Sequence, residues 1–218
     1  GHGTLMNEYQ LVKAMLLHLS RGLSGDAPLA KGLKDWTLDN LAWLDLGICK
    51  QDATDWESLK LALLRWRLPE APEPYVMEIS DTLAELLDLD IENWTLLALL
   101  IGCDRLPKLQ SLSEVATAKG LDLPVLLAEL CDVSAHDALR FVRRSPVFRL
   151  GLIGFKAHRR GVAVDIKWTL ETLLDRAPSQ GQEFVDALIG PRHESGLSLQ
   201  DFAEVKDAQF LFALLDGA

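Results

Sequence analysis

The sequence predicts a mainly α-helical protein, consisting of a helical bundle followed by a winged-helix-like α+β subdomain. Three observations lead to this prediction. In the first half, apolar residues recur at three- and four-residue steps, the spacing of one face of a helix. A proline-rich stretch then interrupts this pattern. Later, three short helical patterns precede a strand-like segment, a basic loop and a second strand-like segment, which is the order of a winged helix.

The N-terminal helical subdomain is expected over residues 4–68. Its first apolar face runs from about Leu5 to Leu19, and Gly22 and Gly25 then end the helix. Two more helical faces follow, one through Leu38, Leu41, Leu44 and Ile48 and the other through Trp56, Leu59, Leu63 and Trp66.

A link that contains Pro69, Pro72 and Pro74 separates this bundle from the second subdomain, which is expected over residues 76–176. Ser80 can cap the first helix after the link. The next helix, from about Ile91 to Ile101, is apolar on nearly every side, so we expect it at the centre of the core.

The predicted winged-helix order begins with short helices at residues 111–118 and 124–130. Ser134, with Asp137 three residues later, resembles a capping box that opens a third helix through residue 144. A strand-like segment at residues 147–155, a wing at residues 156–161 and a strand at residues 162–168 complete the order. Short helices at residues 169–174 and 182–189 and a helix opened by Ser198 come last, and residues 182–218 form the expected C-terminal unit. The final helix has no strong cap, which predicts that the natural chain continues.

Composition indicates a globular protein of the cytoplasm. The chain has 218 residues, of which 49% are hydrophobic and 25% charged. The apolar runs are shorter than the roughly 20 residues that a membrane-spanning helix needs. Cys49, Cys103 and Cys131 are an odd number of widely spaced cysteines within apolar helical patterns, which predicts buried thiols in a reducing compartment.

The sequence contains no complete catalytic, cofactor or metal motif, so we predict that this chain is not an enzyme and has no catalytic, cofactor-binding or metal-ligating residue. No phosphate-binding loop or Gly-x-Ser-x-Gly elbow occurs, and His18, His136, His158 and His193 are isolated from one another. An enzyme with a dispersed active site is the remaining alternative.

A basic segment stands out in a chain whose net charge is -10. Residues 138–167 contain eight of the 22 Lys and Arg residues but only one of the 32 acids, Asp165. This segment predicts an interaction surface for a protein or for the acidic part of this chain, or else for nucleic-acid phosphates. The predicted surface residues are Arg140, Arg143, Arg144, Arg149, Lys156, Arg159 and Arg160.

Two stretches resemble the N-terminal, non-ATPase region of a group of bacterial AAA+ ATPases. Residues 199–215 are similar to the segment just before the nucleotide-binding core, where an Asp-Phe pair, here Asp201-Phe202, opens a helix. Ser145-Pro146-Val147 and residues 150–153 are similar to a region where a helix leads into a strand after a Ser-Pro step. The matching stretches cover about 30 residues of the chain.

The resemblance implies an accessory domain that binds a protein substrate or adaptor and couples it to the ATPase. It implies no cofactor in this fragment, and ATP and magnesium in an oligomeric full-length protein. The alternative hypothesis is a winged-helix regulator that binds nucleic acid through residues 140–167. No membrane partner is expected.

Overall fold

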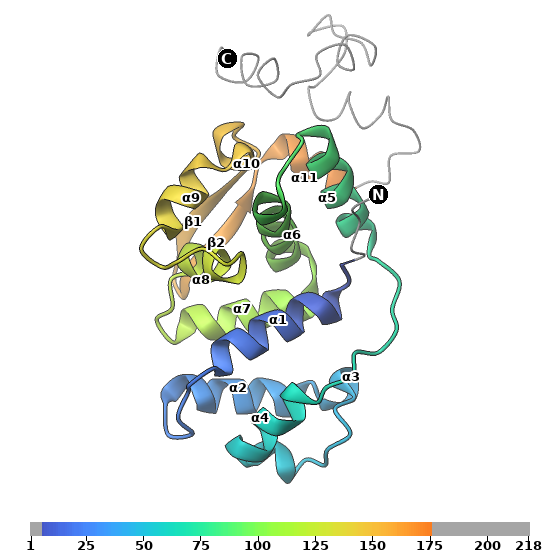
Figure 1. Cartoon of the computed structure of the whole chain (residues 1–218), viewed down its shortest axis with the longest axis vertical. Coiled ribbons are helices and arrows are strands. Elements are labelled where there is room, and N and C mark those ends of the chain that lie inside the picture. Colours follow the sequence, from blue (N-terminus) through green and yellow to red (C-terminus); the bar gives the residue numbers. More distant parts are fainter. Residues whose placement is uncertain (1–5, 176–218) are drawn as a thin grey trace, which may run out of the picture.

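The computed structural model describes residues 6–175 and shows a mainly α-helical protein with a small two-stranded sheet (Figure 1). The predicted fold class, a helical bundle followed by a small α+β region, is confirmed. The expected unit at residues 182–218 lies outside the described residues, as do the helices expected at residues 182–189 and after Ser198.

Helix α1 (Glu8–Ser20) carries the first predicted apolar face. Asn7 forms a capping box with Gln10: the Asn7 side chain accepts from the Gln10 amide, and the Gln10 side chain accepts from the Asn7 amide. Gly22 has a φ of 64°, so the chain turns away directly after the helix, as expected.

The second predicted helix, with a face through Leu38, Leu41, Leu44 and Ile48, does not form as one helix. The chain forms α2 (Pro28–Asp39), α3 (Leu41–Leu44), the 3₁₀ turn η1 (Asp52–Thr54) and α4 (Trp56–Leu64). Leu38 and Ile48 therefore belong to no common helix. Asp45 and Gly47 both have positive φ angles, 52° and 69°, and this left-handed backbone ends α3 before Ile48.

The predicted cap at Ser80 is also wrong. Helix α5 (Tyr75–Leu86) begins after Pro74, so Ser80 is a buried residue within the helix. Pro74 has a φ of -62°, which suits the entry to a helix, and its missing amide leaves no unsatisfied donor there. Residues 67–74, between α4 and α5, have neither helix nor strand structure.

Helix α6 (Ile91–Arg105) is the central helix, as predicted. Every residue from Leu96 to Cys103 is buried, and the helix contacts α1, α5, α7, α8 and the sheet. In Figure 1, α6 stands between α5 and the sheet, whereas α1 and α7 cross below it and α2, α3 and α4 form the lower end.

The α+β region follows the predicted order, with one added helix. It contains α7 (Pro107–Ala118), α8 (Leu123–Leu130), α9 (Ala138–Arg144), α10 (Pro146–Arg149), β1 (Ile153–His158), β2 (Gly161–Ile166) and α11 (Trp168–Asp175). Ser134 and Asp137 bond to each other in a turn, and α9 begins only after that turn.

The antiparallel hairpin shortens the expected wing. Ile153 pairs with Ile166 at one end and His158 with Gly161 at the other, so the turn consists of Arg159 and Arg160 alone. The prediction that residues 156–161 form a loop is therefore wrong for Lys156 to His158, which are part of β1, and for Gly161, which begins β2. The expected strand at residues 147–155 starts with the helix α10 instead.

Buried residues from both predicted subdomains, 4–68 and 76–176, form one continuous core. Helix α1 packs against α6, α7 and α8, and Glu8 accepts a 2.6 Å hydrogen bond from the Lys108 amide at the start of α7. Cys103 and Cys131 are buried as predicted, whereas Cys49 is exposed in the turn before η1, so the prediction for Cys49 is wrong.

Candidate interaction surface

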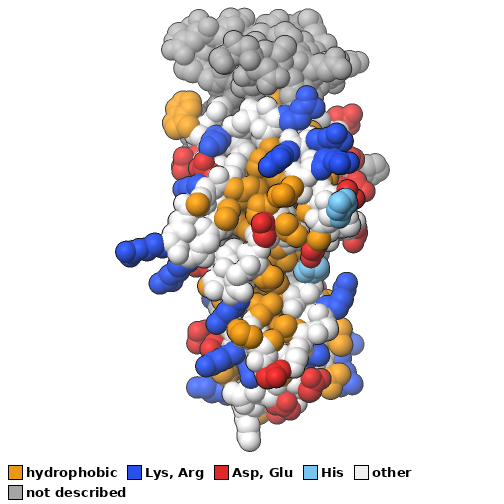
Figure 2. Space-filling model, turned by 90° about the vertical axis from the view of Figure 1, so that its left-hand side faces the viewer, with side chains coloured by type: hydrophobic (Ala, Val, Ile, Leu, Met, Phe, Trp, Pro, Cys, Tyr) orange, Lys and Arg blue, Asp and Glu red, His pale blue; other side chains and the backbone are white. Residues whose placement is uncertain are grey.

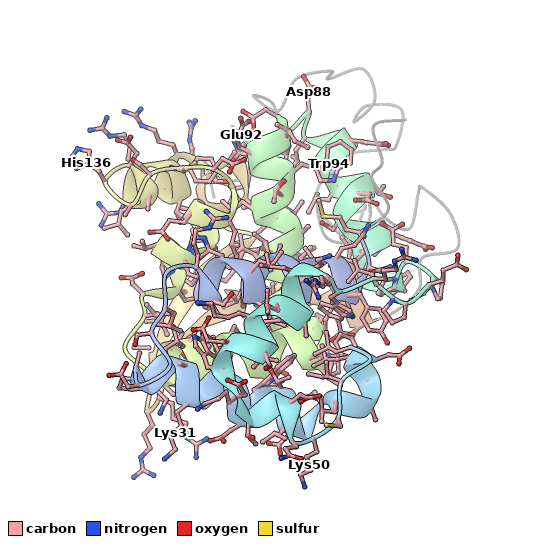
Figure 3. The ribbon with its side chains drawn as sticks, turned by 60° about the horizontal axis from the view of Figure 1, so that its bottom comes forward. Lys31, Lys50, Asp88, Glu92, Trp94 and His136 are labelled. Carbon is pink, nitrogen blue, oxygen red and sulfur yellow. The ribbon has the colours of Figure 1, made fainter. Side chains whose placement is uncertain are left out.

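Helix α9 presents a basic outer face. Ala138 and Val142 are buried and hold the helix against α8, while Arg140, Arg143 and Arg144 are exposed. Leu139, which is 48% exposed, lies beside these arginines on the helix surface. His136, just before α9, points outward in Figure 3.

The α9 arginines, Arg140, Arg143 and Arg144, take part in none of the ion pairs of the described residues, 6–175. The two last-turn arginines also sit at the negative end of the helix dipole, which stabilises α9. Their charge is thus available for an incoming carboxylate or phosphate.

Of the other predicted surface residues, Arg149 is on α10, which contacts α9, and the remaining three are on the hairpin. Arg149 ends α10, Lys156 is in β1, and Arg159 and Arg160 form the hairpin turn; all four are exposed. The start of β1 is close to α10, which contacts this strand. The last residue of β1 is about 17 Å from the first, at ~3.3 Å per residue, so the strand carries the turn away from α10.

The hairpin turn lies against the C-terminal end of α7. A Cβ on Gly161 would come within 3.0 Å of the Thr117 Cβ atom, so only glycine allows this approach. The seven predicted residues therefore form an α9–α10 group and a hairpin group, and the hairpin group contains Lys156, Arg159 and Arg160. Their clustering in sequence gave no sign of this division.

An apolar groove lies next to α8, and sequence reasoning missed it. It has a volume of about 160 Å³, and its wall comes from the end of α1, the start of α2, and α8 with the turn before it. Its lining residues are His18, Leu19, Leu29, Leu121, Asp122, Val125, Leu126 and Glu129. The one local signal was Leu121, an apolar residue within a polar turn and 38% exposed.

The charged groups of this groove already have partners. The Nε2 atom of His18 is 2.7 Å from Oε2 of Glu129. Asp122 caps α8 by accepting a 3.2 Å hydrogen bond from the Val125 amide. The rest of the groove lining consists of leucine and valine side chains.

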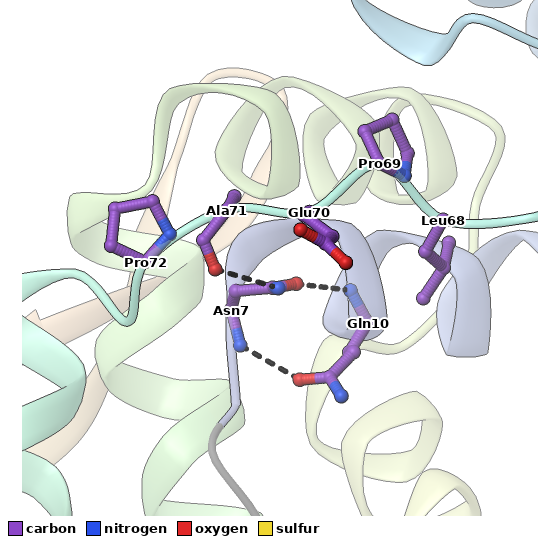
Figure 4. Close-up of a pocket in the computed structure, with 7 residues that line it drawn as sticks. All are labelled: Asn7, Gln10, Leu68, Pro69, Glu70, Ala71 and Pro72. Carbon is purple, nitrogen blue, oxygen red and sulfur yellow. Dashed lines mark hydrogen bonds between the residues drawn. The ribbon is translucent and has the colours of Figure 1, made fainter.

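A second, shallow pocket lies between α1 and the link (Figure 4). It has a volume of about 650 Å³ and is lined by Asn7, Gln10, Leu68, Pro69, Glu70, Ala71 and Pro72. Asn7 and Gln10 use their side chains in the capping box, and the Asn7 amide group also donates to the Ala71 carbonyl at 3.4 Å. Most of the polar groups of Asn7 and Gln10 are thus used in hydrogen bonds within the fold.

The link also brings two carboxyl groups together. Burial and the hydrogen bond and charge of Asp81 raise the pKa of Glu73 to about 7. Trp94, which projects from α6 toward α5, donates a 3.0 Å hydrogen bond to Asp81 (Figure 3). The Oε1 atom of Glu73 is buried without a hydrogen-bond partner. This pair ties the link to α5 and lies far along the chain from α9.

Neither a metal-ligand cluster nor a membrane-spanning helix occurs among the described residues. No three His, Cys, Asp or Glu residues of the 6–175 range are placed to hold a metal ion. In the same range, no helix combines the length and the apolar character needed to cross a bilayer.

Comparison with known proteins gives no match, whether with protein-family models, curated proteins or solved structures.

Proposed function

We propose that this chain is the accessory, non-catalytic N-terminal part of a bacterial AAA+ ATPase and that it binds a protein substrate or adaptor through the outer face of α9. The observation that supports a binding role is the set of exposed arginines around Leu139 without acidic partners in residues 6–175. Such a surface, with an apolar centre and a charged rim, is typical of protein interfaces.

The ATPase part of the proposal rests on the resemblance at residues 199–215 and around Ser145-Pro146. In the structure Ser145 precedes the one-turn helix α10, and β1 follows at Ile153. In such a protein, ATP and magnesium bind to the ATPase core and not to these 218 residues. The full-length protein is then an oligomer in the cytoplasm.

The gene downstream of residue 218 tests the ATPase part. We expect a Gly-x4-Gly-Lys-[Ser/Thr] run within about forty residues, because this loop holds the nucleotide phosphates. Its absence would remove the ATPase from the proposal and leave the binding module.

Nucleic acid is the second candidate partner. It is favoured by the order of helices α7 to α10 followed by a hairpin whose turn consists of Arg159 and Arg160, which resembles the order of a winged helix with one helix added. Against it, four of the seven residues of α9, ALRFVRR, are apolar, and the helix carries no Asn or Gln for reading adenine edges. The chain's charge of -10 also opposes phosphate binding outside this segment.

Photo-crosslinking distinguishes the two partners. A photoreactive amino acid replaces Leu139 in the parent organism, and the same residue replaces Leu64 of α4, 67% exposed, as the matched control. We expect protein adducts at position 139 that disappear in the Arg143→Gln/Arg144→Gln background. Nucleic-acid adducts, or equal adducts at positions 139 and 64, would overturn the proposed protein-binding role of α9.

A further inference from the structure

We propose that the groove between α1, α2 and α8 and the basic face of α9 together bind one amphipathic, acidic helical segment of the partner protein. This inference rests on the proposed function and specifies the chemistry of the partner. The apolar side chains of the segment fill the groove, and its carboxylates meet the α9 arginines. This is the helix-in-groove mode of peptide recognition.

The groove has the size and the lining for side chains of a larger partner. Its volume of about 160 Å³ is well below the roughly 300–1,000 Å³ of pockets that hold a whole small molecule. Leu29, Leu121 and Val125 supply apolar surface that remains partly exposed. Covering this surface with aliphatic side chains removes it from water and is favourable.

The groove itself selects against acidic groups. Glu129 is paired with His18, and Asp122 is bonded to the helix amide of Val125. A carboxylate that enters the groove would meet the negative charge of these two acids. An apolar side chain avoids this repulsion.

The α9 arginines provide the charge complementarity that identifies the rest of the segment. Helix α9 packs directly on α8, which forms one wall of the groove. Packed helices are about 8–10 Å apart, and the arginines lie on the exposed face of α9, beyond this helix pair. A partner helix of about four turns, ~22 Å, is therefore long enough to contact both the groove and the basic face. Figure 2 shows hydrophobic side chains along the middle of this side of the molecule, with Lys and Arg side chains gathered near its upper end.

A set of synthetic peptides tests this arrangement on the 218-residue chain. The probe is a helical peptide with leucines on one face of its first two turns and glutamates in its next two turns. One comparison peptide has alanine in place of leucine, and another has lysine in place of glutamate. Binding is measured by fluorescence anisotropy, with a DNA duplex as a separate ligand.

Variants of the groove and of the α9 face measure how much each part of the surface contributes to the affinity for the peptide. Leu29→Gln and Leu121→Gln change the groove without adding charge, and Leu64→Gln on α4 is the matched control. Arg143→Gln/Arg144→Gln changes α9, and Arg65→Gln/Arg67→Gln changes two other exposed arginines. Thermal melts verify that each variant is folded.

We expect the leucine–glutamate peptide to bind, and its Kd to rise about tenfold with the groove variants and about tenfold with the α9 variant. Both controls should leave the Kd within about twofold, and both comparison peptides should bind at least about tenfold more weakly. No binding of the probe, or unchanged affinity in both groove variants, would overturn the proposed occupant. Photo-crosslinking at position 139 would still decide separately whether α9 binds a protein.

Discussion

The imidazole Nε2 atom of His18 lies 2.7 Å from the Oε2 atom of Glu129, and this contact joins the last turn of α1 to α8 at the edge of the groove. The two side chains are 27% and 29% exposed. Water therefore reaches both groups and weakens their attraction.

We expect removal of this pair to have a small effect on stability. His18→Ala and Glu129→Gln should each lower the free energy of unfolding by less than about 1 kcal/mol, with a coupling energy of about 0.5 kcal/mol in a double-mutant cycle. Urea unfolding of the four proteins measures both values. A coupling energy above about 2 kcal/mol would mean that the pair is shielded from water far more than its exposure indicates.

The raised pKa of Glu73 predicts that the free energy of unfolding depends on pH. Burial and Asp81, with a smaller contribution from Glu78, raise the pKa of Glu73 to about 7, above the ordinary value of 4.5. The folded state thus favours the protonated carboxyl. Its stabilising effect is fully present below pH 4.5 and is lost as the pH rises through about 7.

The corresponding variant is Glu73→Gln, which keeps a neutral hydrogen-bonding group and removes the titration. We expect it to raise the free energy of unfolding at pH 8 by about 1 kcal/mol, a value reduced because water partly reaches the site. At pH 4.5 it should have little effect. Thermal melts at both pH values measure this, and Glu70→Gln in the same link is the control. Equal effects at both pH values would contradict a titrating Glu73.

Gly102 allows α6 to approach its neighbours closely. A Cβ at this position would lie 2.7 Å from Cδ2 of Leu109 and 3.2 Å from Cδ1 of Leu11, and both leucines are buried. Gly102→Ala gains about 1 kcal/mol of helix propensity, but overpacking costs about 1–3 kcal/mol. We expect a net loss of about 1 kcal/mol in urea unfolding.

Gly32 of α2 is the matched comparison for this substitution. Its Cβ would lie 3.1 Å from Cγ1 of Val115 and 3.2 Å from Cε of Lys119. The Lys119 side chain is exposed and flexible and can move aside. Gly32→Ala has the same gain in helix propensity of about 1 kcal/mol, against only the contact with Val115, so it should be neutral or stabilise the protein by up to about 1 kcal/mol. A stabilised Gly102→Ala protein would show that α6 and α7 can separate without cost.

The features predicted correctly from the sequence are those with a strong local pattern. The apolar face of α1 repeats at helical spacing, and α6 is apolar on nearly every side, which fixed its central place. Alternation at residues 162–168 predicted a strand, and β2 spans Gly161–Ile166. The errors at Ser80 and Ile48 arose where a nearby proline or a left-handed residue decided the helix ends.

The groove and the division of the basic residues depend on contacts between distant segments. His18, Leu29 and Val125 are brought together only by packing of α1, α2 and α8, so no sequence window contains the groove. Likewise, Arg144 and Arg159 are close in sequence, but β1 carries Arg159 toward α7. Local periodicity carries no information on either arrangement.

The three cysteines predict a clear difference in thiol reactivity. Burial raises the pKa of Cys103 and of Cys131 to about 12, so neither forms the reactive thiolate near neutral pH. Cys49 is exposed and its thiol is 3.2 Å from Asp52. A disulfide reagent such as Ellman's reagent should thus modify one thiol of the native protein rapidly and the other two only after unfolding.

The variant Cys49→Ser identifies the reactive thiol. Because Cys103 lies within α6 and Cys131 directly after α8, both among core residues, their modification requires the core to open. The native Cys49→Ser protein should then react at the rate of unfolding, whereas Cys103→Ser should keep the rapid reaction. Rapid modification of Cys49→Ser would show that α6 or α8 leaves the core far more often than its packing indicates.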